Sequence, residues 1–370
     1  MQERLKDIVW LFLLSFFSIA CQSGSHVDKE KNMQEIPVEL KGPDREAGIS
    51  LYDIVDPPRV FYVDPGFPIS YVYSIKYVCG RYYLTDFRRQ SILVFDDAGQ
   101  VLLNLSRKGR AENEWVKMEC FDVNPSNGQI SVYDIATRRI VVYSESGEYL
   151  RQIVLEDGVG IFNDFAVKED GSYLVYISFG NPAVPTNPTG LIDVDRDGTI
   201  ARVLAPLDDD FRHVKSYIPY TNFHRLSDGT LTLRGEQDKN EIYHYSSEGV
   251  LSVPYQFKYD VEWPASVRAM EKPFEESVYY SVSQYFETDH WLGALIYFRK
   301  DERILLFYNK ETGEAFSGKA SGDRRLADVF KVGEKDIIYY SFSAGDRIMQ
   351  AFSPEDSDDN RIRVIVYPEK

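Results

Sequence analysis

Short apolar runs of strand-forming residues recur along this chain at a fixed distance. One run ends in Asp86, and the next is followed by a turn at Gly99. The same order returns at Asp134 and Gly147, each 48 residues after its counterpart. A repeat of this length, carried by β-type residues with turn residues between them, is typical of the blades of a β-propeller.

Glycine-containing turns divide each repeat into four strands. A short apolar strand turns at a first glycine, continues into a longer apolar strand, and reaches its outer strand through a hairpin at a second glycine. The inner turns are predicted at residues 79–80, 127–128, 170–171, 228–229 and 332–333, and the outer turns at Gly99, Gly147, Gly198, Gly249 and Gly313. These turns place six blades near residues 72–106, 119–155, 162–206, 219–259, 279–318 and 326–367. The predicted fold class is all-β, a six-bladed β-propeller of four-stranded antiparallel blades.

Several runs are apolar at consecutive positions instead of alternate ones, as in residues 139–143 and 304–308. A strand has this pattern when neighbouring layers cover both of its faces, which favours blades packed in a ring over an open sheet. Residues 59–63 precede the first blade and are predicted to form a strand that closes the ring against the last blade. The recurring Asp86 and Asp134 are predicted to cap tight turns by accepting hydrogen bonds from backbone amides.

The charge balance excludes one class of partner. The chain has 370 residues and a formal net charge of −16, with 58 acidic against 42 basic residues. Binding of a nucleic-acid backbone requires a basic face, so no nucleic acid is expected. Cys79 and Cys120 are expected on opposite faces of the disc, too far apart for a disulfide, and are predicted to be unpaired.

The N-terminus carries a targeting segment. Arg4 and Lys6 precede an apolar run over residues 8–17, which is too short to span a membrane. Residues 18–21, Ser-Ile-Ala-Cys, resemble the lipobox of bacterial lipoproteins, in which the cysteine is acylated after cleavage. We therefore predict a signal peptide over residues 1–20, lipidation at Cys21, a flexible tether over residues 21–48 and the propeller over residues 49–370.

Two further segments carry a resemblance to known families. Asp86, the pair Arg88 and Arg89, the run 92–95 and Gly99 resemble the NHL repeat. Residues 107–115, which join the first two blades, resemble a loop of six-bladed β-propeller lipoproteins of Bacteroidota, although residues 111–113 depart from its Gly-Pro-Gly centre. This resemblance implies an exported, lipid-anchored propeller of the outer membrane or cell envelope, in a family without an assigned reaction.

An aspartate-rich segment admits two interpretations. Asp193, Asp195, Asp197 and Gly198 reproduce the start of a calcium-binding loop, but Leu204 stands where a bidentate glutamate is needed. Gly198 also occupies the position of an outer hairpin turn, where aspartates are common. The turn interpretation is favoured, and a calcium site remains the alternative; no other cofactor is predicted.

Polar and aromatic residues are expected to meet at the central channel. The innermost strands of neighbouring blades should bring several of them to one side of the channel mouth, forming a ligand-binding site. The residues proposed for this site are Tyr73, Asn163, Asp164, Tyr220, Asn222 and His224. Gluconolactonase-type propellers hold a metal in this channel, but a water-filled polar channel is the favoured interpretation.

Three functions are compatible with these patterns. The leading one is a monomeric, membrane-anchored propeller that binds an envelope protein or glycan without catalysis. The second is a metal-dependent lactonase or lyase with its site in the central channel, and the third is a structural accessory lipoprotein of an outer-membrane uptake assembly. No motif for a serine nucleophile, a zinc protease or a phosphate-binding loop occurs in the chain.

Overall fold

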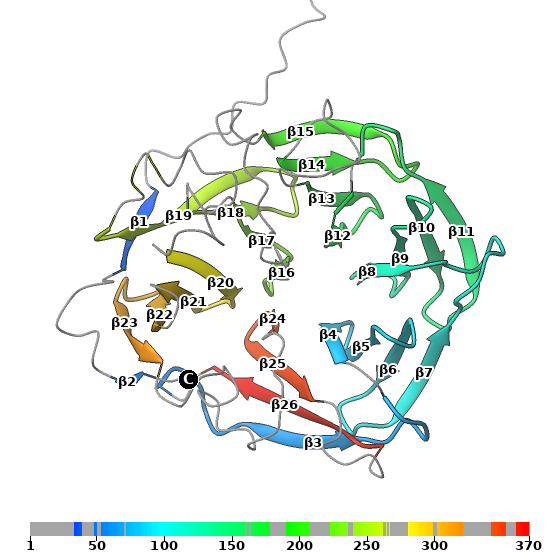
Figure 1. Cartoon of the computed structure of the whole chain (residues 1–370), viewed down its shortest axis with the longest axis horizontal. Helices are drawn as coiled ribbons and strands as arrows, with labels where there is room; N and C mark the ends of the chain where they lie inside the picture. Colours follow the sequence, from blue (N-terminus) through cyan, green and yellow to red (C-terminus); the bar gives the residue numbers. More distant parts are fainter. Residues whose placement is uncertain are drawn as a thin grey trace, which may run out of the picture.

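The strands form six blades arranged as a ring around a central channel (Figure 1). The computed structural model describes residues 33–38, 48–49, 53–69, 72–159, 161–162, 164–177, 190–206, 223–235, 240–261, 264, 266, 280–298, 302–320, 342–352 and 360–369. The inner strands of the fourth and sixth blades pair with each other, which joins these two blades into one nine-stranded sheet. In each blade the first strand lies beside the channel. The predicted fold class is confirmed.

The first three blades each contain four antiparallel strands. Blade 1 comprises β4 (Val72–Val78), β5 (Arg81–Asp86), β6 (Ser91–Phe95) and β7 (Val101–Ser106). Blade 2 comprises β8 (Met118–Val123), β9 (Ile130–Asp134), β10 (Arg139–Tyr143) and β11 (Tyr149–Val154). Blade 3 comprises β12 (Phe165–Val167), β13 (Tyr173–Ile177), β14 (Gly190–Val194) and β15 (Ile200–Pro206).

The last three blades also receive strands from the N-terminal part of the chain. Blade 4 comprises β16 (His224–Arg225), β17 (Leu231–Arg234), β18 (Glu241–Tyr245) and β19 (Leu251–Tyr259), and β1 (Gln34–Val38) pairs in parallel with β19. Blade 5 comprises β20 (Tyr280–Glu287), β21 (Trp291–Phe298), β22 (Glu302–Asn309) and β23 (Ala315–Ala320), and β2 (Gly48–Ile49) pairs in parallel with β23. Blade 6 comprises β24 (Phe342–Ala344), β25 (Arg347–Phe352), β26 (Ile362–Pro368) and β3 (Arg59–Val63).

The ring closes where the two ends of the propeller share blade 6. The strand β3 pairs antiparallel with β26, so a segment that precedes blade 1 supplies the outermost strand of the last blade. This confirms the closure predicted from residues 59–63. The inner strand of blade 6 begins at Phe342, later than the predicted blade start at residue 326, and the predicted turn at 332–333 lies outside the described residues.

Turn residues fix the ends of the strands as the sequence predicts. The outer hairpin glycines all have positive φ, from 74° at Gly313 to 92° at Gly198. Oδ1 of Asp86 accepts hydrogen bonds from the amides of Arg88 and Arg89, at 3.1 Å each. Oδ1 of Asp134 accepts one from the amide of Ala136, so each aspartate caps the turn into the third strand. Asp134 also accepts from the amides of Val116 and Lys117, just before β8.

The core consists of hydrophobic clusters between neighbouring blades. Six such clusters occur among the described residues, one for each pair of adjacent blades, including the pair of blades 6 and 1. In one consecutive apolar run, Ile140 and Val142 face the cluster between blades 2 and 3, whereas Val141 and Tyr143 face the cluster between blades 1 and 2. This arrangement explains why such runs do not alternate, because both faces of each blade are covered.

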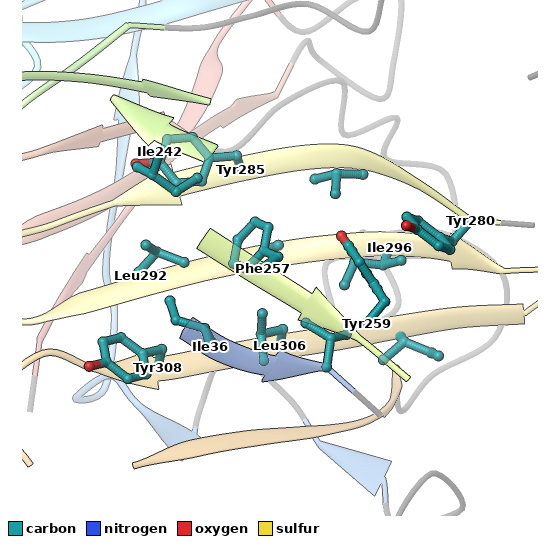
Figure 2. Packing of buried hydrophobic residues seen from close by; sticks show 14 of the residues in the cluster. Ile36, Ile242, Phe257, Tyr259, Tyr280, Tyr285, Leu292, Ile296, Leu306 and Tyr308 are labelled. Carbon is teal, nitrogen blue, oxygen red and sulfur yellow. The ribbon is translucent and has the colours of Figure 1, made fainter. Parts of the chain in front are cut away.

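The N-terminal segment forms a belt around blades 4, 5 and 6, which we define as β1, β2 and β3. Each of these strands lies at the outer edge of a different blade. Ile36 of β1 packs with Phe257 of blade 4 and Leu306 of blade 5, in the cluster between those two blades (Figure 2). Residues 34–38, which the sequence assigned to a flexible tether, are therefore a strand of the propeller, because their inward side chains complete this cluster.

Cys79 is exposed, Cys120 is buried, and both are unpaired as predicted. Within the described ranges, no helix has the length and apolar character needed to cross a membrane. Cys21 lies outside the described residues.

Candidate functional site in the central channel

A small cavity lies in the central channel between the innermost strands. Its volume is about 60 Å³, which is room for a few water molecules. The channel is narrow partly because β16 and β24 pair in parallel at Arg225 and Ala344, so that the inner strands of blades 4 and 6 meet inside the ring. The residues around the cavity come from β4, β8, the start of β12, β16 and β24.

Four charged residues form an ion cluster in the wall of this cavity. The Nζ atom of Lys76 lies 3.0 Å from Oδ1 of Asp122 and 3.5 Å from Oδ1 of Asp164. A second cation, Arg225, has its Nη2 atom 3.7 Å from Oδ2 of Asp122. We call these four residues the channel ion cluster. Its two positive and two negative charges balance, as buried charges must if they are to be tolerated.

The environment of the cluster keeps its lysine charged. Burial opposes the charge of Lys76, but the carboxylates of Asp122 and Asp164 outweigh burial and raise the pKa of Lys76 to about 12. Burial raises the pKa of Asp164, while Lys76 acts in the opposite direction. Burial lowers the pKa of Arg225, with Asp122 acting against it.

The same side chains join four neighbouring blades through the backbone. Oδ2 of Asp122 on blade 2 accepts a hydrogen bond of 2.7 Å from the amide of Val167 on blade 3. Oδ2 of Asp164, before blade 3, accepts one of 2.9 Å from the amide of Phe223, before blade 4. Arg225 on blade 4 donates to the carbonyl of Val167 at 2.7 Å. With Lys76 on blade 1, the cluster therefore fixes the inner strands of blades 1 to 4 relative to one another.

The structure brings together two of the residues predicted for a binding site. Asp164 and His224 both contribute to the cavity wall. His224 is buried, and its Nε2 atom lies 3.0 Å from the carbonyl oxygen of Tyr285 on blade 5. Both side chains thus have internal partners. Asn163, Tyr220 and Asn222 lie outside the described residues, as does the side chain of Tyr73, so the predicted binding site stays a prediction.

Sequence reasoning missed the residues that dominate the cavity, namely Lys76, Asp122 and Arg225. A signal for two of them exists in the sequence. Lys76 and Arg225 each stand four residues before the positive-φ glycine of an inner turn, Gly80 and Gly229. A cation on an innermost strand is surrounded by the other blades, so such a residue needs a buried carboxylate partner.

The aspartate-rich segment forms the hairpin turn between β14 and β15. The carboxylate of Asp193 forms ion pairs with Lys168 and with Arg202, whose Nε lies at 3.1 Å. Oδ1 of Asp197 accepts hydrogen bonds from the amide and hydroxyl of Thr199, which lower the pKa of Asp197. Across the described parts of the chain, no three His, Cys, Asp or Glu side chains gather closely enough to hold a metal ion. The carboxylate of Asp193 is thus paired with two cations of the protein beside this turn.

Comparisons with known proteins agree with this architecture. The family model described as a domain of unknown function (DUF4934) matches residues 69–363. A protein from Bacteroides fragilis, described as a candidate for export, superposes with a TM-score of 0.69 at 14% identity, over 91% of this chain and 100% of its own. A member of the DUF4221 family from Bacteroides vulgatus superposes with a TM-score of 0.55 at 11% identity, over 85% and 97% of the two chains. Among proteins with curated functions, none is significantly similar to this chain. At these identities the structural likeness shows the fold alone.

Proposed function

This chain belongs to the DUF4934 family, and we propose that it is an exported, lipid-anchored β-propeller that binds a protein or glycan partner at the cell envelope without catalysis. The observation that carries this proposal is the channel ion cluster. Its charges neutralise one another and hold four blades together, so they serve the fold. Recognition is then left to the loop faces and the channel mouth, where propellers can present variable residues.

The geometry does not favour a metal-dependent lactonase or lyase in this channel. A metal bound by Asp164 would have to displace the ammonium group of Lys76, which stands 3.5 Å from its Oδ1 atom. A general base needs a free lone pair directed at the substrate. Oδ2 of Asp164 is bound by the amide of Phe223, and Nε2 of His224 faces the carbonyl of Tyr285.

The belt gives the anchor a defined place of attachment. The twelve residues 22–33 separate the proposed lipidated cysteine, Cys21, from β1 at the outer edge of blade 4. Twelve residues span at most about 40 Å, so the membrane would hold the propeller by its rim. Both loop faces would then stay accessible to a partner. Residues 18–21 support lipidation, and the likeness to a candidate exported protein supports export.

The anchor is tested by membrane fractionation of a single variant. Cys21→Ala should release the folded propeller into the soluble fraction, because the remaining sequence has no second membrane attachment in this proposal. Circular dichroism of the released protein provides the control for folding. A variant that stays in the membrane fraction after its signal peptide has been cleaved would show that the lipid anchor is wrong.

The binding role is tested by photocrosslinking in intact cells. Phe87 lines the channel cavity at the turn between β5 and β6, and its replacement by benzoylphenylalanine keeps an aromatic side chain at the mouth. Leu150, which is 45% exposed on the outer strand β11, is the matched control position on the rim. We expect a discrete adduct from position 87 and none from position 150. The same adducts from both positions, or none from either, would contradict recognition at the channel mouth.

A further inference from the structure

The residue that follows β26, Glu369, has a buried carboxyl group without a hydrogen-bond partner. Its side chain is 4% exposed, and both carboxyl oxygens are buried. Neither oxygen forms a hydrogen bond within the described structure. Buried polar atoms are nearly always hydrogen-bonded, so this group requires an explanation. Such a site tolerates the neutral acid far better than the carboxylate, because burying an unpaired charge costs much more than burying a neutral polar group.

Burial raises the pKa of Glu369 to about 7, and the charged groups nearby do not offset it. The Nε2 atom of His290 stands 3.9 Å from Oε2, and the amide of His290 also attracts the carboxylate, but without the geometry of a hydrogen bond. Asp289 repels a second negative charge, and Lys310 is already paired with another carboxylate at 3.0 Å. The other charged residues on the segments packed here are Asp53, Asp56, Glu287, Glu311, Asp346 and Arg347.

Glu369 stands where three parts of the ring meet. The amide of Asp56, between the belt strands β2 and β3, donates to the carbonyl of Pro368 at 2.9 Å. The amide of Glu369 donates to the carbonyl of Asp346, in the turn between β24 and β25 of blade 6, at 3.3 Å. Its carboxyl group faces His290, in the turn between β20 and β21 of blade 5. The position of this one residue therefore links the belt, blade 6 and blade 5.

The belt segment at this junction is buried. Ile54 is 0% exposed and Val55 is 2% exposed, and both pack in the cluster between blades 5 and 6, beside Trp291 and Tyr367. Val55 also forms a β-bridge with Glu369. A carboxylate at position 369 gains hydration only by turning toward solvent. That movement would break the bridge at Val55 and loosen the belt segment from the cluster.

We propose that Glu369 is a proton-controlled latch between the belt and blades 5 and 6. At low pH the neutral carboxyl group stays buried and the latch is closed. At higher pH the group ionises and turns toward solvent, which releases residues 53–56 while the interfaces between the other blades stay packed. This latch acts at the ring closure and not at the channel mouth, so it goes beyond the binding role proposed above.

Hydrogen exchange of the full chain at pH 6 and pH 8, followed by mass spectrometry, tests the latch. With a pKa of about 7 in the closed state and an ordinary value of about 4.5 in the open state, the opening equilibrium should increase about tenfold between these pH values. After correction for the intrinsic effect of pH on exchange, peptides covering residues 53–56 and 362–369 should show this increase. A peptide covering residues 149–154 of blade 2 should not, because its strand does not contact the junction.

Two variants assign the response to one carboxyl group. Glu369→Gln keeps the size of the side chain but cannot ionise, so exchange at the junction should change less than about twofold between pH 6 and pH 8. Glu314→Gln, which removes an exposed carboxylate from blade 5, should retain the tenfold increase. Circular dichroism of both variants is the control for folding. The proposal is overturned if the tenfold increase persists in Glu369→Gln, which would assign it to another group such as His290. It is also overturned if the wild type shows no increase, or shows the same increase in blade 2.

Discussion

The belt strand β1 gives a sharp test of how the N-terminal segment stabilises the propeller. Ile36 is 0% exposed and packs in the cluster between blades 4 and 5, although it lies near the start of the described chain. Its neighbours include Phe257 on β19 and Leu306 on β22 (Figure 2). If β1 is an integral strand, truncating this side chain should destabilise the whole domain.

The expected magnitude follows from the atoms removed. Ile36→Ala deletes three buried carbon groups, which at about 0.8 kcal/mol each amounts to roughly 2.4 kcal/mol of lost transfer free energy. The remaining cavity adds to this, so we expect a loss of about 3 kcal/mol in the free energy of unfolding, within the range of about 2–5 kcal/mol for such changes. For a propeller of about 300 residues this corresponds to a decrease of about 5 °C in melting temperature.

Differential scanning calorimetry measures the effect, and Glu35→Ala is the matched control. Glu35 is exposed on the same strand, and its ion pair with Lys258, at 3.5 Å, is also exposed. Such pairs contribute at most about 1 kcal/mol, so the control should shift the melting temperature by less than about 2 °C. A change below about 1 °C in Ile36→Ala would mean that β1 is not part of the cooperative unit. In that case the β19 amides of Ile36→Ala would also exchange hydrogen no faster than those of the wild type.

Two buried glutamates should affect stability at opposite ends of the pH range. Burial alone would raise the pKa of Glu287, but His244 at 2.8 Å and Lys310 at 3.0 Å lower it to about 2. The ion pairs of Glu287 therefore stabilise the fold above pH 4.5, and this stabilisation is lost as the pH falls toward 2. Between these pH values, the free energy of unfolding measured in urea should therefore fall by about 3 kcal/mol less in Glu287→Gln than in the wild type. An equal decrease in the two proteins would contradict the assignment. The side chain of Glu369 is 4% exposed, and burial raises its pKa to about 7, although His290 acts in the opposite direction. Ionisation of Glu369 as the pH rises from 4.5 through 7 therefore destabilises the fold. Glu369→Gln should have a higher urea midpoint than the wild type at pH 8 and the same midpoint at pH 4, whereas a lower midpoint at pH 8 would refute this reasoning.

The architecture was predictable because its signals are local. Turn glycines such as Gly99 and Gly147 need positive φ, and they recur at the spacing of one blade. The strands of a blade are covered on both faces and are therefore apolar at consecutive positions. This pattern can be recognised in the sequence without knowing which blades are adjacent. The belt was not predictable in this way. The strand β1 places only two residues, Ile36 and Val38, in the core, and it contains a proline, which is tolerated because it lies at a sheet edge.

The candidate site was also predictable only where the signal is local. Asp164 and His224 could be placed beside the channel because their strands are innermost, and both do contribute to its wall. Which groups they contact depends on pairings between blades, and Lys76 is 46 residues from Asp122 along the chain, with no local pattern that joins them. A lysine within an apolar strand is nevertheless informative by itself. Burying an unpaired ammonium group would destabilise the fold too strongly, so Lys76 requires carboxylates from other blades. This requirement predicts a closed, charge-balanced channel, whereas the polar residues considered one by one suggest an open binding site.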